Sequence, residues 1–483
     1  MPEPKKTTAF FPDWVMLDRT GRTNYYDAGD HEARDKVVGV DPTAVVVKTP
    51  SGGSGYCSFT LASPPAFSYL DLYWPIGETT FSGFPIDPVY ASVVAADKNL
   101  VLLSIAIPSL PCYYDVPHDL FVYTAAVHCP SLERLPLDTV PAPNLEDFRK
   151  FFVSKFDIGI LRLAGDQGHY VVADLIVSDN NFLQLCVFSS AAQEGRKVSR
   201  FMGPTSPWRV FTRRPQLENG GKFPLGWMTS TVVPFDGRFL CWVDYFSGLL
   251  LSDFSKSKAP VLRFVPFPGL QYTGRVLRTV GRCCPDRFRS VSISKGKMCF
   301  VHIDNDFHQS DMDQSNMDCE DADLENVQNS VPKITIWTLN VAEFKWEQRC
   351  QIGLDKIWAQ PIYQHKRIPQ GRLPEFPVIS VDNPDLVWCL LRHKEFHGKT
   401  WMAELDMKRS ELRSCTPYVN EQPYCDQNIE LKNSFANVPP LPTAFSKDLT
   451  NTTGIVGGRD KFANRASKKG KLSRQGLEFR QSC

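Results

Sequence analysis

An acidic segment at residues 304–330 carries the side chains best suited to bind a metal ion. Few large apolar side chains separate its carboxylates, which are Asp304, Asp306, Asp311, Asp313, Asp318, Glu320, Asp321, Asp323 and Glu325. Asp311 and Asp313 have the spacing that opens an EF-hand calcium loop, but Asn316 replaces its glycine and Ala322 its bidentate glutamate. The segment is therefore predicted to be a mobile, solvated insert between strands, and no metal ligand is assigned.

The histidines and cysteines do not have the spacing of a zinc site. His393 and His397 are four residues apart, but strand signals surround them, so a surface loop is predicted there rather than a zinc-binding helix. The sequence has no Cys-x-x-Cys pair, and Cys283 and Cys284 are adjacent, which suits neither zinc nor an ordinary disulfide. Cysteines in apolar runs are predicted to be buried free thiols: Cys186, Cys241, Cys299 and Cys389.

The signatures of common catalytic classes are also missing from the sequence. Residues 52–55 form a Gly-Gly-Ser-Gly loop that lacks the Gly-Lys-Ser/Thr ending of a phosphate-binding loop. No Gly-x-Ser-x-Gly nucleophile elbow occurs. The sequence therefore assigns no catalytic residue, no cofactor-binding residue and no cofactor, and we expect the protein not to be an enzyme.

A basic cluster near the end of the chain is the other charged motif: Lys468, Lys469, Lys471 and Arg474. Its composition fits either a nuclear import signal or a solvated terminus. The net charge of +1 gives no electrostatic footprint for nucleic acid, which is not an expected partner. The first residues lack the apolar run of a secretory signal, and no run approaches the roughly 20 residues that span a bilayer. We therefore expect a cytoplasmic protein without a membrane partner, with nuclear import as the alternative.

The elements that would position these residues are predicted to be strands. Residues 237–253 have the pattern of an apolar strand, a turn marked by Asp244 and Gly248, and a second apolar strand, each buried on both faces. Similar units recur, and Val291 and Ile293 alternate with serines as in a half-buried strand. Short strands without intervening helices indicate antiparallel sheets. The predicted fold is all-β, a β-propeller-like array of small antiparallel sheets that limits exposed edges, with stacked β-sandwiches as the alternative.

Composition divides the chain into three parts. Residues 1–9 are a polar leader, and residues 10–440 form the β domain with the acidic insert inside it. Residues 441–483 are predicted to be a disordered basic tail.

Several apolar blocks occur in an order that is specific when they are taken together. They are Trp14–Asp18, Trp242–Asp244 with Gly248–Leu250, Arg263–Pro268, Ser292–Lys297 with Phe300–Val301, Ile334–Leu339, and Pro377–Ser380 with Asn383–Asp385. In this order the blocks resemble a plant family, expanded in grasses, that is known as domain of unknown function 1618. The resemblance covers roughly residues 10–410 and implies a plant protein. It carries over no catalytic residue, because the family has no established chemistry.

Three functional hypotheses follow from the predicted fold. The leading one is a non-enzymatic protein-interaction scaffold with an unknown protein partner, because loops on a rigid β scaffold suit binding. The second is a substrate-recognition module that resembles the propellers attached to F-box proteins. The third is an enzyme or sugar-binding protein with a pocket at the propeller axis, which Asp, Glu and His side chains converging at one mouth would favour.

Overall fold

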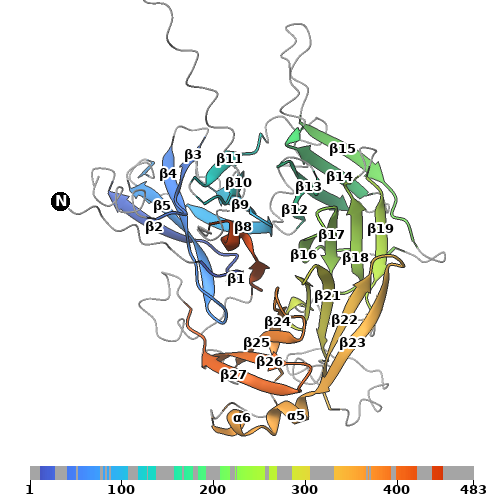
Figure 1. Cartoon of the computed structure of the whole chain (residues 1–483). Coiled ribbons are helices and arrows are strands. Elements are labelled where there is room, and N and C mark those ends of the chain that lie inside the picture. Colours follow the sequence, from blue (N-terminus) through green and yellow to red (C-terminus); the bar gives the residue numbers. More distant parts are fainter. Residues whose placement is uncertain are drawn as a thin grey trace, which may run out of the picture. The chain divides into compact units, whose positions relative to one another are not determined.

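The computed structural model of the chain (Figure 1) describes a defined set of residues, all within the compact unit Phe11–Leu449. They are residues 11–27, 41–49, 53–76, 80–81, 84–85, 89–106, 118–127, 129–136, 157–165, 168–177, 183–191, 207–217, 223–224, 226–255, 260–268, 285–304, 331–365, 368, 371, 373–392, 399–420 and 438–449. The polar leader, the acidic insert beyond Asp304 and residues 450–483 lie outside this set, so the mobility predicted for the insert and the disorder predicted for the tail stay predictions.

Five blades of the fold are four-stranded antiparallel sheets whose strands follow chain order. Blade 2 is β8 (Tyr90–Asp97), β9 (Leu100–Ala106), β10 (His118–Thr124) and β11 (Ser131–Arg134). Blade 3 is β12 (Ile158–Arg162), β13 (Tyr170–Val177), β14 (Leu183–Ser189) and β15 (Trp208–Arg213). Blade 4 is β16 (Thr231–Phe235), β17 (Phe239–Asp244), β18 (Gly248–Asp253) and β19 (Leu262–Pro266). Blade 5 is β20 (Arg289–Ser294), β21 (Lys297–Ile303), β22 (Lys333–Asn340) and β23 (Lys345–Gly353). Blade 6 is β24 (Glu375–Ile379), β25 (Leu386–Arg392), β26 (Thr400–Asp406) and β27 (Glu411–Pro417).

Blade 1 combines strands from both ends of the described chain. Its strand order is β28 (Leu441–Thr443), β1 (Val15–Leu17), β5 (Phe67–Ile76), β4 (Ser54–Thr60) and β3 (Val45–Lys48). β28 pairs antiparallel to β1, whereas β1 and the separate strand β2 (Arg22–Asp27) both run parallel to β5. The pairing of β28 with β1 closes the sheets into a six-bladed β-propeller, which confirms the predicted propeller-like fold.

Helical elements are few and short among the described residues. α5 (Leu354–Trp358) and α6 (Pro361–His365) connect blades 5 and 6 and pack against their shared core. The 3₁₀ helix η3 (Pro285–Arg287) precedes β20, and η7 (Phe445–Leu449) follows β28. A small hairpin, β6 (Thr80–Phe81) and β7 (Phe84–Pro85), lies between β5 and β8. None of the helices that the structure describes is long and apolar enough to cross a bilayer.

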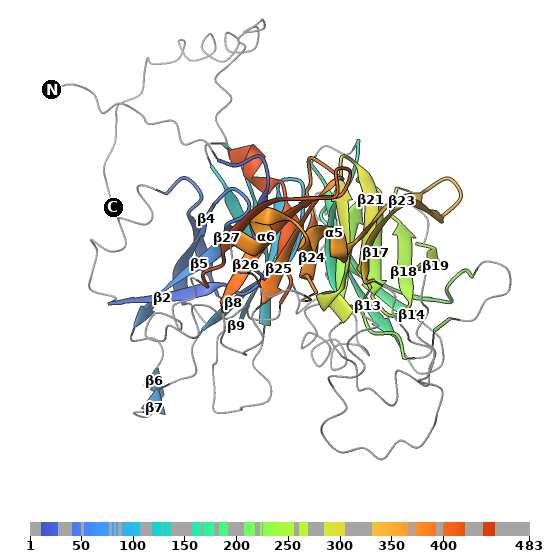
Figure 2. The same ribbon diagram turned by 90° about the horizontal axis from the view of Figure 1, so that it is seen from below.

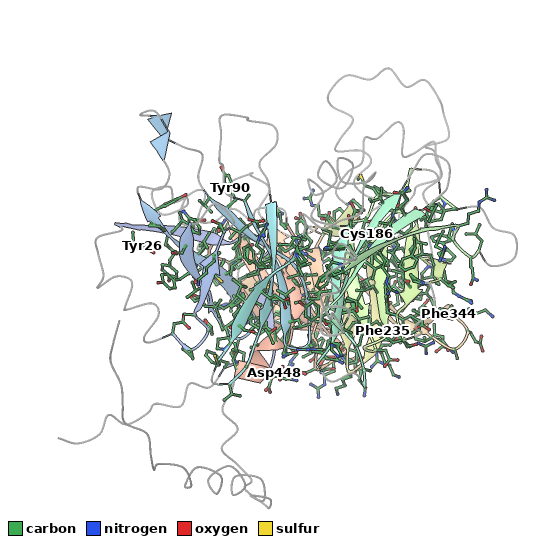
Figure 3. All side chains as sticks on the ribbon, turned by 90° about the horizontal axis from the view of Figure 1, so that it is seen from above. Tyr26, Tyr90, Cys186, Phe235, Phe344 and Asp448 are labelled. Carbon is green, nitrogen blue, oxygen red and sulfur yellow. The ribbon has the colours of Figure 1, made fainter. Side chains whose placement is uncertain are left out.

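The ring has two ends, which differ in the connections that they carry. The first strands of blades 2–6 contact their neighbours around the axis, and β28 joins them in blade 1. The end of the ring at which these first strands begin is called the crossover mouth. The end at which they finish is called the turn mouth. Figure 2 shows the ring from its side, with β6 and β7 beyond the crossover mouth. In Figure 3, Tyr90 lies toward the crossover mouth, while Phe235 and Asp448 lie toward the turn mouth.

An apolar core fills each junction between neighbouring blades, including the junction of blade 6 with blade 1. In β17, Trp242 faces blade 3 while Cys241 and Val243 face blade 5, so both faces of the strand are buried as predicted. The four cysteines predicted as buried free thiols are free and buried. Gly159 of β12 permits a close approach, because a Cβ there would lie 2.4 Å from Val232 Cγ1 of blade 4.

Two details of the sequence interpretation are wrong. Ser292 and Ser294 are buried and Ile293 is partly exposed, because β20 is a first strand enclosed by neighbouring blades rather than a half-buried one. The Ser294 hydroxyl is satisfied by donating to the Ser380 carbonyl of blade 6 at 2.6 Å. The β domain also continues past residue 440, because β28 and η7 contribute to the closing blade and to the core beside it.

Candidate functional site at the crossover mouth

An arginine from the N-terminal segment enters the axis of the ring. β1 and β2 both pair with β5, but residues 19–21 between them leave that ladder and bond to β8 of blade 2. The Val93 N–H donates to the Arg19 carbonyl at 2.9 Å, and the Gly21 N–H donates to the Ala91 carbonyl at 3.0 Å. A Cβ on Gly21 would lie 2.8 Å from that same carbonyl oxygen, so glycine permits the approach. This detour directs Arg19 toward the axis.

The Arg19 guanidinium joins blades that are not neighbours in the ring. Its Nη1 donates to the Val94 carbonyl of blade 2 at 2.7 Å, and its Nη2 donates to Thr231 Oγ1 of blade 4 at 3.0 Å. Burial lowers the pKa of Arg19, while Tyr245 and Asp286 favour its charged form. Because a guanidinium is not deprotonated in proteins, the group stays cationic at physiological pH. A fixed positive charge therefore lies near the axis.

Tyr245, in the turn that joins β17 to β18, connects blade 4 to blade 5. Its hydroxyl accepts a hydrogen bond from the Val291 N–H at 3.2 Å, and its carbonyl accepts one from Arg289 Nη1 at 2.6 Å. Burial raises the pKa of Tyr245 to about 12, so its hydroxyl stays protonated. Burial also raises the pKa of Asp286, although Arg19 and backbone N–H groups oppose the rise. Arg19 and Asp286 therefore interact electrostatically, and Arg289 is joined to the same region through Tyr245.

A second ionic group lies between blades 5 and 6. Glu375, the buried first residue of β24, pairs with Arg287 of η3 and with Arg392, whose Nε lies 2.8 Å from Glu375 Oε2. Each guanidinium also lies 5.4 Å from the ring centroid of a phenylalanine, Phe288 for Arg287 and Phe376 for Arg392. One carboxylate thus faces two guanidinium groups.

The backbone beside Glu375 is strained. Phe376 has a φ of +50°, in the left-handed region that a large L side chain rarely adopts, and the ladder between β24 and β25 shifts register after Glu375. Such a conformation costs of order 1–3 kcal/mol and persists where the surroundings determine it. Bulges are frequent beside binding sites because they redirect a side chain. Here the bulge lets Glu375 face the arginines while Phe376 packs toward blade 1.

Two further titratable groups near this mouth are held neutral. His302 lies opposite Arg289 in the ladder, and burial together with Arg289 lowers the pKa of His302 to about 3. Asp174, on the mouth-side half of β13, pairs in register with Ile158 and Cys186. Burial and the nearby Asp157 raise the pKa of Asp174 to about 8. The lasting charges of the mouth therefore come from its arginines and their partner carboxylates.

Exposed apolar side chains surround the same mouth. Tyr90 begins β8, Met228 precedes β16, Val331 precedes β22 and Val419 follows β27, with exposed fractions of 53%, 51%, 40% and 53%. Tyr25 of β2 is also exposed, and its hydroxyl accepts a hydrogen bond from the Val89 N–H at 2.9 Å, next to Tyr90. Tyrosine, methionine and arginine are enriched at protein interfaces, and this mouth presents all three.

The metal and catalytic motifs weighed from the sequence do not meet at this mouth among the described residues. No group of three or more His, Cys, Asp or Glu side chains in the described part of the chain could hold a metal ion. His393, His397, Cys283, Cys284 and the basic tail lie outside the described residues.

Sequence reasoning missed the residues that do meet here. Arg19 and Glu375 have no motif, since their positions depend on the detour after β1 and on the bulge in β24. A polar residue at the start of an otherwise apolar run, as at Glu375, was the available signal. Among the described residues, this mouth brings arginines together with Asp286 and Glu375, and His302 and Asp174 lie nearby.

Comparison with known proteins finds one family model that matches part of the chain. Residues 242–388, from the end of β17 to the start of β25, match the family model described as "Protein of unknown function (DUF1618)", which supports the resemblance noted in the sequence. No curated protein matches the sequence.

Solved structures show distant similarities. A Bacteroides uniformis protein assigned as a 6-phosphogluconolactonase has a TM-score of 0.31 at 10% identity and covers 79% of this chain and 86% of its own. The β-propeller domain of the Trilobed protease from Pyrococcus furiosus has a TM-score of 0.29 at 8% identity, with 72% and 73% covered. A variant of the Synechocystis apocarotenoid oxygenase has a TM-score of 0.29 at 9% identity, with 85% and 79% covered. At these values the fold assignment depends on the sheet topology, and no activity is transferred.

Proposed function

We propose that this chain is a non-enzymatic protein-interaction scaffold whose partner binds at the crossover mouth. The observation that carries the proposal is the gathering of exposed Tyr90, Met228, Val331 and Val419 around one end of a rigid ring. Single exposed apolar residues are ordinary, but their concentration on one face marks an interaction surface.

The distribution of connecting segments supports the same face. Long connections leave the crossover mouth, for example from Ile303 to Lys333 and from Pro266 to Pro285. The other end carries short turns such as Lys98–Asn99 and Lys295–Gly296, and one long connection, from Ser189 to Trp208. Binding residues in propellers and other rigid β scaffolds concentrate on their connecting loops. A partner at this mouth would therefore contact both fixed strand ends and the connections between blades.

Paired surface variants test the proposal. The variant Tyr90→Asp with Met228→Asp alters the crossover mouth, and Val46→Asp with Val261→Asp alters side chains of similar exposure away from it. Each full-length chain is fused to a proximity-labelling enzyme in cells, and labelled proteins are compared after equal melting temperatures are verified. We expect the first variant to lose a defined set of the wild-type partners and the second to keep it. Equal retention or equal loss in both would refute a binding face at this mouth.

The proposal includes a plant origin, which the resemblance to the grass-expanded family supports, and a cytoplasmic location. Nuclear import through Lys468, Lys469, Lys471 and Arg474 is the alternative location. Residues 455–483 fused to a fluorescent protein too large for passive entry distinguish the two. Cytoplasmic fluorescence would support the proposed location. Nuclear accumulation that disappears when the four residues become alanine would show nuclear import instead.

A further inference from the structure

We propose that residues 438–449, which we name the closing strap, open and reclose while the six blades stay folded, and that this opening regulates the crossover mouth through β1. The inference rests on the proposed scaffold function and adds a means of regulating it. The strap contains β28 and η7, and η7 lies at the turn mouth, where Figure 3 labels Asp448. Two properties carry the inference: the strap is held by few groups, and the strand that it pairs with leads directly to Arg19.

β28 is held to the rest of its blade along one side. It pairs with β1 over residues 441–443, and none of the described strands pairs with its other side. At the centre of this short pairing, Pro442 lies opposite Met16 and has no backbone N–H to donate. By comparison, β17 lies between β16 and β18 and pairs with both along most of its length. The backbone pairing alone therefore gives the strap little stability.

One aromatic side chain anchors η7 to the blades. Phe445 is fully buried in the core between blades 1 and 2, where its ring centroid lies 4.9 Å from that of Phe59 and 6.3 Å from that of Tyr123. Leu449 packs into the same core. Because the hydrophobic contribution of a side chain grows with the apolar area that it buries, Phe445 is the main contact that keeps the strap closed.

Other groups of η7 oppose closure or add little to it. The Ser446 hydroxyl is fully buried and has no hydrogen-bond partner in the described part of the chain, so closing the strap costs the hydration of this group. Burial also raises the pKa of Asp448, although Arg162 and Lys447 oppose the rise. Lys447 Nζ lies 3.9 Å from Asp382 Oδ1, and both side chains are about half exposed, so this ion pair contributes little. Segments held in this way open locally at a lower free energy than the whole domain.

β1 connects the strap to the crossover mouth. Leu17, the last residue of β1, pairs with Leu441 of the strap, and Arg19 follows two residues later. At that point the Val93 N–H donates to the Arg19 carbonyl, and the Arg19 guanidinium donates to Thr231 of blade 4. When the strap opens, β1 keeps its pairing with β5 but loses its partner on the side of the axis. The backbone that directs Arg19 into the mouth is then less constrained, so the two ends of the ring are coupled.

Hydrogen–deuterium exchange of the full-length protein, followed by mass spectrometry, measures the opening of each segment. Ser446→Ala removes the buried hydroxyl, so exchange in the strap should slow about five- to tenfold. Exchange in β1 and at the hydrogen-bonded amides of Gly21 and Val93 should slow with it. The matched control is Ser252→Ala, because the Ser252 hydroxyl is also fully buried without a partner among the described residues but lies in β18 of blade 4. The control should leave exchange in the strap within about twofold of the wild type.

Phe445→Ala should act in the opposite direction. Loss of the anchoring ring should accelerate exchange in the strap and in β1 at least about tenfold, while β17 and β18 keep the protection that they have in the wild type. A synthetic peptide of residues 438–449, added to this variant, should slow the exchange of β1 again, because the peptide fills the site that the altered strap leaves.

Strap amides that exchange as slowly as those of β17 in the wild type would show that the strap does not open on its own, and so would loss of protection throughout the blades of Phe445→Ala. An effect of Ser446→Ala that is confined to the strap, with Gly21 and Val93 unchanged, would reject the coupling to the crossover mouth. The exchange measurements need no partner, so they decide the strap independently of the scaffold function. Retention of every wild-type partner by the Tyr90 and Met228 variant would refute that function and leave the opening of the strap intact.

Discussion

The two mouths of this propeller are held together in different ways. At the turn mouth, backbone N–H groups of one turn bond to the neighbouring turn: the Arg162 N–H donates to the Asp97 carboxylate at 2.7 Å, the Ala164 N–H to the Gly237 carbonyl at 2.8 Å, and the Lys295 N–H to the Val381 carbonyl at 2.9 Å. The Arg162 guanidinium adds one side-chain bond there, to Asn99 Oδ1 at 2.7 Å. At the crossover mouth, large side chains such as Trp242, Tyr245 and Arg19 reach from one blade to another. One end is therefore fixed mainly by bonds between neighbouring turns, and the other by a few large buried side chains that join blades.

The largest expected effect concerns Trp242, which joins blades 3 and 4 near the crossover mouth. Its side chain is fully buried, and its indole N–H donates to the Asp157 carbonyl at 2.7 Å. Trp242→Ala should lower the free energy of unfolding by about 3–5 kcal/mol, because it leaves a large cavity. Denaturant unfolding measures this loss, with Trp242→Phe as the control that keeps much of the volume. A melting curve unchanged in Trp242→Ala would show that this junction is not core.

Asp174 is expected to make stability depend on pH. Its pKa is raised to about 8 in the folded protein, mainly by burial, compared with about 3.9 in an unfolded chain. The folded state therefore holds a proton that the unfolded state releases, so this contribution to stability falls as pH rises from about 4 to 8. Asp174→Asn should match the wild type near pH 4 and exceed it by about 2–3 kcal/mol near pH 8. Parallel stability curves for the two proteins would contradict this assignment.

Arg19 tests whether one side chain stabilises the crossover mouth across blades. Arg19→Met keeps an apolar stem and removes the hydrogen bonds to Val94 and Thr231, so a loss of about 1.5–2 kcal/mol is expected. The control is Arg349→Met, whose ion pair with Asp385 is partly exposed and should contribute about 0–1 kcal/mol. Urea titrations compare the two variants. If Arg19→Met loses no more stability than Arg349→Met, then Arg19 does not stabilise the crossover mouth across blades.

The smallest effect belongs to the turn mouth, where several turns place non-glycine residues in the left-handed region. Lys295 has a φ of +47° and is exposed in the tight turn between β20 and β21. Asparagine tolerates this region better than lysine, so Lys295→Asn should raise stability by about 0.5 kcal/mol. Thermal melting detects such a gain, and Lys297→Asn, one residue beyond the turn, should show none. A decrease in Lys295→Asn would mean that the lysine side chain stabilises this mouth.

Much of the fold follows from patterns within single hairpins. The predicted strand–turn–strand unit at residues 237–253 is β17 and β18, and its turn lies at Asp244 and Gly248 as expected. The continuous apolar character of β17 indicated burial on both faces, which a propeller blade provides. Pairings such as β28 with β1 could not be predicted, because strands of three residues have no periodicity to distinguish them from coil.

The candidate site was much less predictable than the fold. The Arg19 side chain bonds to Thr231, which is 212 residues away in the sequence, only because the ring places the N-terminal segment beside blade 4. In the sequence, Glu375 resembles any charged residue that precedes an apolar strand. No residue pattern around Phe376 indicates its left-handed φ. These site residues are positioned by closure of the ring and by the bulge in β24, and neither feature can be recognised in a single sequence.

The pairing of β28 with β1 also determines when the ring can close during synthesis. β28 follows every other described strand, so a ribosome must release residues 441–449 before blade 1 gains its innermost strand. Until then β1 presents an unpaired edge, the kind of edge that invites pairing with another chain. A nascent chain that stops after blade 6 has most of its blades but not a closed ring. Closure of the ring therefore depends on residues 441–449, which are synthesised last among the described strands.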